Sequence, residues 1–186
     1  MRLLLLLIIS VTLGFAGNLK NENILLGLPF GFKLGNKAYD PKTHYSLFEY
    51  VPNTETVYNW SEMLTVNIYH SNVPMSAEKY TDYIKSLWMQ SCKNGDTKDL
   101  LKGIENGYRY SLIMLSCPKS ITSNKDEFTW MKAVQGHDGF YVVQRAVSKA
   151  PDKKKIIQII QYLKTVQICD TRLNNCPQLK KLDMKH

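Results

Sequence analysis

Apolar and polar residues alternate along several parts of the chain, and this period of two predicts β-strands. The clearest example is "EMLTVNIYH", residues 62–70, where Leu64, Val66 and Ile68 alternate with polar or amphipathic neighbours. Further strands are expected where β-branched and aromatic residues cluster. They are expected at residues 30–35, 45–52, 108–116, 127–134 and 140–147.

Two segments carry weaker patterns. Residues 100–105 favour a strand that precedes Asn106-Gly107, the strongest two-residue hairpin signal. A short helix over residues 98–104 is the alternative. Residues 17–28 are expected to form a short arm before the first strand.

Two other stretches change to a helical period, with an apolar residue at every third or fourth position. The first lies between residues 76 and 90, with Ser76 as a suitable N-cap. Its apolar face consists of Ala77, Tyr80, Ile84, Leu87 and Trp88. The second opens at Pro151 and Asp152 and is expected to end at Cys169. Its apolar face consists of Ile156, Ile159, Ile160 and Leu163.

The order of these elements is strands, helix, strands, helix. Because turns link the sequential strands, the sheet should be largely antiparallel. The sequence therefore predicts an α+β fold.

The first sixteen residues, "MRLLLLLIISVTLGFA", match a secretory signal peptide. Arg2 precedes an apolar run, and Gly14 and Ala16 are small residues at the positions that a signal peptidase reads. A transmembrane anchor is the alternative, but the run is shorter than the ~20 residues that a spanning helix needs. We expect residues 1–16 to be a signal peptide and residues 17–186 to be a single exported α+β domain without a transmembrane segment.

The four cysteines are expected to form disulfides, because disulfides persist in the oxidising compartments that exported proteins reach. Four cysteines allow three pairings. Proximity in sequence favours Cys92 with Cys117 and Cys169 with Cys176. Zinc is the competing interpretation, but no C-x-x-C motif occurs and no histidine lies near a cysteine at ligand spacing. No metal and no cofactor is therefore expected.

The layout of "GLPFGFKL" and "YSLFEYVPNTETVYNWSEMLTVNIY" resembles the entry into the Mog1/PsbP-like fold. In that superfamily an early Gly-Phe strand and a second strand precede a long strand that leads into the first helix. The resemblance implies an antiparallel sheet sandwiched by helices, an α-β-α sandwich. It also implies non-catalytic binding as a theme, because Mog1 proteins bind a small GTPase and PsbP proteins bind photosystem subunits.

A second resemblance rests on "YNWSEMLTV", "GYRYSLIMLSCP", "EFTWMKAVQGHDGFYVVQRA" and "ICDTR". These stretches are similar to small exported proteins of gamma-proteobacteria, Legionella and its relatives, some of which are type II secretion substrates. This resemblance implies release beyond the periplasm and a role as a virulence-associated effector. It brings no catalytic motif.

The pair His137-Asp138, between Gly136 and Gly139, allows two interpretations. A histidine beside a carboxylate is the start of an acid–base site, in which the carboxylate orients the imidazole. The alternative is a β-hairpin tip, because the glycines supply turn geometry and adjacent side chains diverge. The hairpin is favoured, and the tip is then a polar surface that a partner could contact.

The other candidate binding residues are Tyr58, Trp60 and Arg145. Exposed aromatic residues often anchor interfaces, and Tyr58 and Trp60 precede the long strand. Arg145 could combine with Lys132 and Glu127, although charges within strands more often face solvent or pair across the sheet. Asp170 and Arg172 are expected to cap the second helix and brace the loop before Cys176.

The chain has a net charge of +8, but its lysines are spread along the sequence. No P-loop, H-E-x-x-H, G-x-S-x-G or G-x-G-x-x-G motif occurs. We therefore expect a secreted or periplasmic, non-catalytic protein that binds a protein or a small ligand. A hydrolase with a non-standard site is one alternative. Binding of anionic lipid or nucleic acid through residues 153–155, Lys180 and Lys181 is the other.

Overall fold

The computed structural model describes residues 21–71, 73–119 and 125–177. The predicted signal peptide lies outside these residues. The strands before the first helix are β1 (Glu22–Leu25), β2 (Phe32–Asp40), β3 (Tyr45–Pro52) and β4 (Glu62–Tyr69). The first helix is α1 (Ala77–Ser91). It is followed by β5 (Asp96–Glu105), β6 (Tyr108–Cys117), β7 (Glu127–Gln135) and β8 (Phe140–Val147). The chain then forms α2 (Lys153–Thr165), β9 (Gln167–Asp170) and a short 3-10 helix (Thr171–Leu173).

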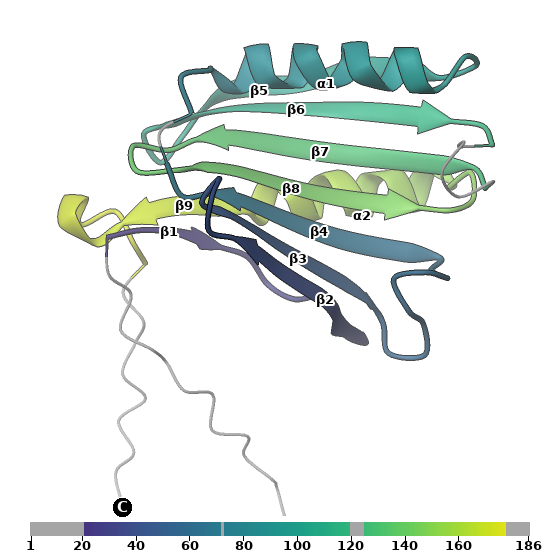
Figure 1. The fold of residues 1–186 in the computed structure, drawn as a ribbon, viewed down its shortest axis with the longest axis horizontal. Helices are drawn as coiled ribbons and strands as arrows, with labels where there is room; N and C mark the ends of the chain where they lie inside the picture. The colour runs from purple at the N-terminus through teal and green to yellow at the C-terminus, as the bar shows by residue number, and fades with distance from the viewer. Residues whose placement is uncertain (1–20, 72, 120–124, 178–186) are drawn as a thin grey trace, which may run out of the picture.

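Seven strands form one antiparallel sheet in the order β2-β3-β4-β8-β7-β6-β5 (Figure 1). Alternate residues of each strand point to opposite faces, and both faces of the central strands are buried. Val142 packs in the cluster that contacts α1, whereas Val143 packs in the cluster that contains Ile159 and Leu163 of α2. The two helices therefore lie on opposite faces, and the predicted α+β sandwich is confirmed.

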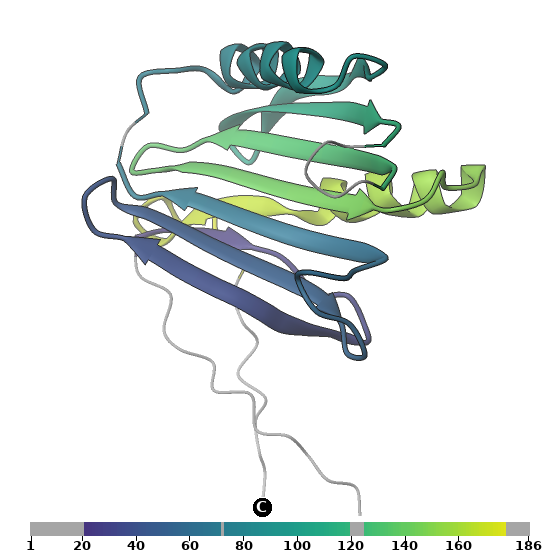
Figure 2. The same ribbon diagram turned by 45° about the vertical axis from the view of Figure 1, so that its right-hand side comes forward.

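Helix α1 is fixed to strand β6 at three points along its length. The Thr81 hydroxyl lies 2.9 Å from the Ser111 hydroxyl, and the Trp88 indole N–H donates to the Ser116 carbonyl at 2.9 Å. The Cys92–Cys117 disulfide ties the end of the helix to the end of β6. Figures 1 and 2 show α1 along the β5–β6 side of the sheet, far from β2 and β3. In the described part of the chain, no helix covers the α1 face over β2, β3 and β4.

The other face carries α2 and a two-stranded sheet formed by β1 and β9. Two predictions were wrong here. The N-terminal arm contains a strand, and α2 ends at Thr165 instead of Cys169. The chain becomes extended at Val166, whose carbonyl accepts a hydrogen bond from the buried Lys132 ammonium, and continues as a strand that pairs with β1.

The remaining differences from the predicted elements are changes of length. The strand expected at residues 30–35 runs over Phe32–Asp40, with a register shift next to Gly35. The weaker strand begins at Asp96 and pairs with β6 as far as Glu105, with one register shift at Leu100, so the helical alternative over residues 98–104 was wrong. Both predicted disulfides, Cys92–Cys117 and Cys169–Cys176, are confirmed. Among the described residues, no helix combines the length and the apolar character needed to cross a bilayer.

Candidate functional site

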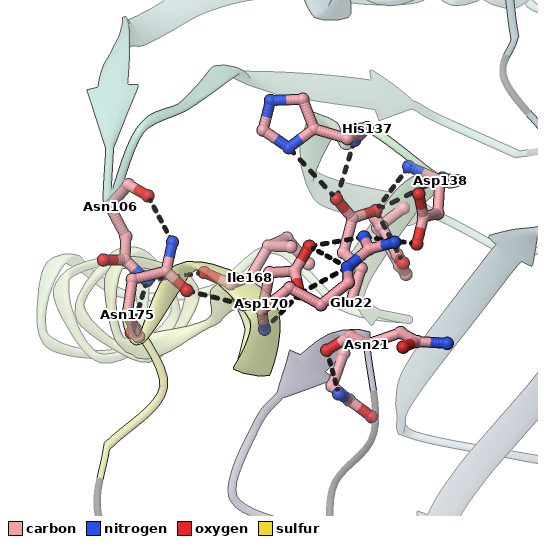
Figure 3. Close-up of polar contacts among 12 residues, drawn as sticks. Asn21, Glu22, Asn106, His137, Asp138, Ile168, Asp170 and Asn175 are labelled. Atoms are coloured by element: carbon pink, nitrogen blue, oxygen red, sulfur yellow. Dashed lines mark hydrogen bonds and ion pairs between the residues drawn. The ribbon is translucent and has the colours of Figure 1, made fainter.

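His137 and Asp138 form the tip of the β7–β8 hairpin, as the glycine-flanked sequence predicted. The tip encloses a carboxylate from a distant part of the sequence, Glu22 of β1 (Figure 3). The side chain of Glu22 is fully buried. It accepts hydrogen bonds from the backbone N–H groups of His137 at 2.7 Å and of Asp138 and Gly139 at 3.2 Å. The Tyr141 hydroxyl donates a further bond at 3.0 Å.

Gly136 is required at this position because of the carboxylate and not because of its own backbone angles. A Cβ atom at Gly136 would lie 2.1 Å from Oε1 of Glu22, far inside van der Waals contact. The hairpin tip is thus an anion-binding turn whose anion is supplied by the N-terminal arm.

Asp138 faces away from its histidine neighbour and pairs with Arg172 at 2.6 Å. Arg172 also binds Asp170 through Nε and Nη2, at distances of 2.5 to 3.0 Å. The hydrogen bonds from Arg172 hold the pKa of the Asp170 carboxyl below its usual value. Asp170 caps the short 3-10 helix and not α2, so the predicted capping of α2 by this pair was wrong.

Asn106 and Asn175 connect this cluster to the β5–β6 turn. The Asn106 amide donates to the carbonyls of Ile168 and Asn175, at 2.8 and 3.0 Å, and the Asn175 side chain accepts the backbone N–H of Asp170. We call Glu22, His137, Asp138, Asp170 and Arg172 the tip cluster. It joins the arm, the hairpin and the segment around β9 (Figure 3).

Glu22, His137 and Asp170 of the tip cluster bring one potential metal-ligand atom each within 4.8 Å of one another. Both carboxylates are already engaged. Glu22 accepts four hydrogen bonds, and Asp170 faces the permanent positive charge of Arg172. A cation here would have to displace these contacts, so the arrangement is that of a structural polar network.

His137 lacks the partners that an acid–base site requires. Its side chain is 61% exposed, and Nδ1 lies 3.6 Å from Glu22, beyond normal hydrogen-bonding distance. Among the described residues, no serine, threonine or cysteine side chain hydrogen-bonds its ring. All four cysteines are in disulfides.

The sequence analysis missed one serine–histidine contact. Ser46 Oγ of β3 lies 2.8 Å from Nε2 of His70. Ser46 is buried, and neither side chain lines the two hollows described below. No carboxylate among the described residues hydrogen-bonds the His70 ring, so the pair lacks the third member of a catalytic triad.

Arg145 lies on the α2 face of the sheet and is buried. It donates to Glu62 at 2.8 Å, and its guanidinium is stacked between the rings of Phe32 and Tyr162, with centroids 5.1 and 5.0 Å away. Lys132 is buried on the same face, where it pairs with Glu105. Both cations therefore serve the packing of this face.

A groove lies on the other face, beside α1, with a volume of about 390 Å³. Its helix side is a stripe of Tyr80, Ile84, Leu87, Trp88 and Ser91. Its floor comes from three strands: Leu115 of β6, Met131 of β7 and Gln144 of β8. We call this hollow the α1 groove. It exists because α1 is fixed to β6, so the side of the helix that faces β7 and β8 is only partly covered.

Glu127 is the only charged residue that lines the α1 groove within the described chain. It is half-buried at the start of β7, and the Thr129 hydroxyl donates to it at 3.2 Å. Burial raises the pKa of the Glu127 carboxyl, and the bond from Thr129 only partly opposes this. No cation among the described residues pairs with it.

Glu127 also lines a second hollow of about 360 Å³, together with Val57, Tyr58 and Trp60. Tyr58 is 94% exposed, whereas Trp60 packs in part against a buried cluster that contains Val51 and Met63. The two aromatic residues predicted as binding candidates thus flank a concave surface next to the α1 groove.

The five predicted binding residues do not form a single site. The strand register pairs Glu62 with Val147 and Tyr69 with Phe140, so the loop that holds Tyr58 and Trp60 lies at the opposite end of the sheet from His137 and Asp138. Arg145 is on the other face from Glu127, so the site that combined these two residues does not form. The only sequence signal for the α1 groove was the apolar stripe on α1, and a buried helix face has the same spacing.

No family model matches the chain, and no curated protein matches it in sequence. Among solved structures, a Mog1 point mutant is similar with a TM-score of 0.48 and 14% identity, over 81% of this chain and 93% of that protein. The Saccharomyces cerevisiae Ran-binding protein Mog1p has a TM-score of 0.47 and 14% identity, over 83% and 98%. The cyanobacterial PsbP of Synechocystis has a TM-score of 0.42 and 11% identity, over 86% and 99%. These likenesses concern the fold alone.

Proposed function

We propose that this chain is an exported, non-catalytic protein that binds another protein through the α1 groove and the adjoining hollow. The observation that carries the proposal is that the largely apolar α1 groove meets a second hollow, lined by aromatic and charged residues, at Glu127. Aromatic and aliphatic side chains with a few polar groups among them are typical of binding sites and interfaces.

Exposed side chains around the hollows favour a protein over a small ligand. Leu87, which lines the α1 groove, is 39% exposed, and Tyr83, one helical turn before it, is 54% exposed. Tyr58, which lines the second hollow, is 94% exposed. A small molecule inside the groove would leave this rim in water, whereas a protein would cover it.

Export is the second part of the proposal. It is supported by the leader-like residues 1–16 and by the two disulfides, which are typical of oxidising compartments. Release beyond the periplasm by type II secretion, and an effector role in virulence, follow from the gamma-proteobacterial resemblance alone. If cell fractionation found the protein only in the periplasm, the proposal of release would be refuted and the proposal of protein binding would still stand.

A hydrolase and a binder of anionic surfaces are less well supported. The His137 and Ser46–His70 arrangements lack partners for catalysis, as described above. Lys153 and Lys154 are exposed, but Lys155 is engaged with Glu62, and Lys180 and Lys181 lie outside the described residues.

Site-specific photo-crosslinking tests the binding proposal. A benzophenone amino acid at Leu87, on the rim of the α1 groove, should give a discrete protein adduct in an extract of the producing cells or their surroundings. The matched control is Ile157 of α2, an aliphatic residue that is 45% exposed on the other face. Equal adducts at both positions, or an adduct at Ile157 alone, would contradict the proposed surface.

A further inference from the structure

The α1 groove combines an apolar channel with a carboxylate, Glu127, that pairs with no cation among the described residues. Tyr80 and Ser91 mark the ends of its helix side. At 1.5 Å per residue this stripe is about 17 Å long. An extended segment of about five residues would fill that length.

The chemistry of the channel changes along its length. Ile84, Leu87, Trp88 and Met131 offer aliphatic and aromatic surface, and Trp88 cannot turn away because its indole N–H is bonded to Ser116. Glu127 lies where the channel meets the hollow of Tyr58 and Trp60. A ligand that follows the channel therefore passes from an apolar surface to an acidic group.

A half-buried carboxylate without a cation is costly to keep, because burial disfavours its charged form. Several other carboxylates that are at least half-buried are held by more donors or by a cation. Glu22 is bonded by four donors, Asp170 by Arg172, and Glu62 by Arg145 and Lys155. Among the described residues, the side chain of Glu127 accepts a hydrogen bond from the Thr129 hydroxyl alone.

We propose that the α1 groove receives an apolar segment of a partner protein that carries a lysine or arginine, whose cation pairs with Glu127. The net charge of +8 disfavours a strongly basic partner over long range. The segment is therefore one with a single basic side chain among apolar ones. This inference rests on the proposed protein-binding function and adds the chemistry of the bound segment.

Selection from a random dodecapeptide library displayed on phage tests the inference with the oxidised protein purified after export. Selected peptides should share one lysine or arginine next to apolar residues. A synthetic peptide of the selected sequence should lose about tenfold or more in affinity for Glu127→Gln. Replacing its basic residue by norleucine should cause a similar loss with the unmodified protein.

Glu78→Gln is the matched control. It removes the same charge from α1 outside the groove and should leave the affinity unchanged. Because glutamine has nearly the shape of glutamate, Glu127→Gln should keep its fold, which circular dichroism and thermal unfolding would verify. The peptide-side change gives an answer that does not depend on any protein variant.

Two outcomes distinguish a failure of this inference from a failure of the proposed protein-binding function. In the first outcome, the selected peptides lack a basic residue and bind Glu127→Gln normally but Leu87→Gln poorly. This would refute the proposed lysine or arginine and keep the α1 groove as the binding surface. Selected peptides that bind Leu87→Gln and Glu127→Gln as well as the unmodified protein, or no selected peptide at all, would overturn both.

Discussion

The tip cluster and the α1 groove differ in how many hydrogen bonds their buried or half-buried carboxylates accept. Glu22 of the tip cluster is fully buried and is bonded by three backbone N–H groups and the hydroxyl of Tyr141. Glu127 of the groove is half-buried and has one hydroxyl. The region richest in chemically suggestive residues is thus a satisfied structural network. The less conspicuous region holds a carboxylate that no described cation pairs with, which is the property expected where a ligand binds.

The largest expected effect comes from breaking the tip cluster. Glu22→Ala should lower the free energy of unfolding by roughly 2–4 kcal/mol, because buried donors lose their acceptor. Gly136→Ala should destabilise as well, since its new Cβ would collide with the Glu22 carboxylate. Urea unfolding measures both losses, and a change below about 0.5 kcal/mol for Glu22→Ala, as for an ordinary surface substitution, would contradict the structural role.

The two disulfides allow the regions to be loosened separately. Serine at Cys92 and Cys117 should reduce the free energy of unfolding by about 3.5 kcal/mol, and serine at Cys169 and Cys176 by about 2.5 kcal/mol, in the chain-entropy model for separations of 25 and 7 residues. Only the first pair ties α1 to β6. Cross-linking from Leu87 should therefore weaken in the first variant, and equal weakening in both would argue against the α1 groove.

Opposite pKa shifts predict opposite pH effects in the two regions. Burial raises the pKa of Glu127 in the folded protein above the ordinary carboxyl value of 4.5. The folded protein therefore loses stability as pH rises from 4.5 through this raised pKa. Glu127→Gln should therefore raise stability at neutral pH, by less than either disulfide changes it, and this gain should disappear at pH values below 4.5. Lys125 and Asp126 border the same hollow and would modulate the midpoint.

The lowered pKa of Asp170 has the reverse consequence. Its contribution is present above the ordinary value of 3.8 and is lost as pH falls through the folded value. Asp170→Asn should lower stability at neutral pH and leave it little changed in strong acid. Thermal unfolding of both variants across pH 2–8 checks the two signs, and shifts of the same sign would contradict the comparison.

The smallest effect is expected for the residue that first suggested catalysis. His137 is 61% exposed and contributes mainly its backbone N–H to Glu22. His137→Ala should change the free energy of unfolding by no more than about 0.5 kcal/mol and should leave binding intact. A loss of a measurable hydrolytic activity in this variant would instead support the hydrolase alternative.

The main sheet and its two helices could be read from the sequence because each element has a clear period. Strand β9 was missed because Val166, Gln167 and Ile168 follow directly on the apolar stripe of α2, and three residues cannot distinguish a last helical turn from a short strand. Its pairing with β1 depends on contacts between segments more than 140 residues apart. A separation of 115 to 119 residues likewise hid the contacts between Glu22 and the hairpin tip.

The α1 groove could not be predicted for a different reason. Tyr80, Ile84 and Trp88 have the spacing of any buried helical face, and only the attachment of α1 to β6 shows that this face is partly open. Glu127 begins a strand like many polar residues at strand ends. That no cation in the described part of the chain reaches Glu127 depends on the fold and not on the local sequence.

The affinity of one selected dodecapeptide for two variants, Leu87→Gln and His137→Ala, tests the central distinction most directly. Isothermal titration calorimetry with each variant and with the unmodified protein supplies the comparison. Our account predicts a loss of about tenfold for Leu87→Gln and unchanged affinity for His137→Ala. Unchanged affinity for Leu87→Gln together with a loss for His137→Ala would place binding at the tip cluster and contradict the account.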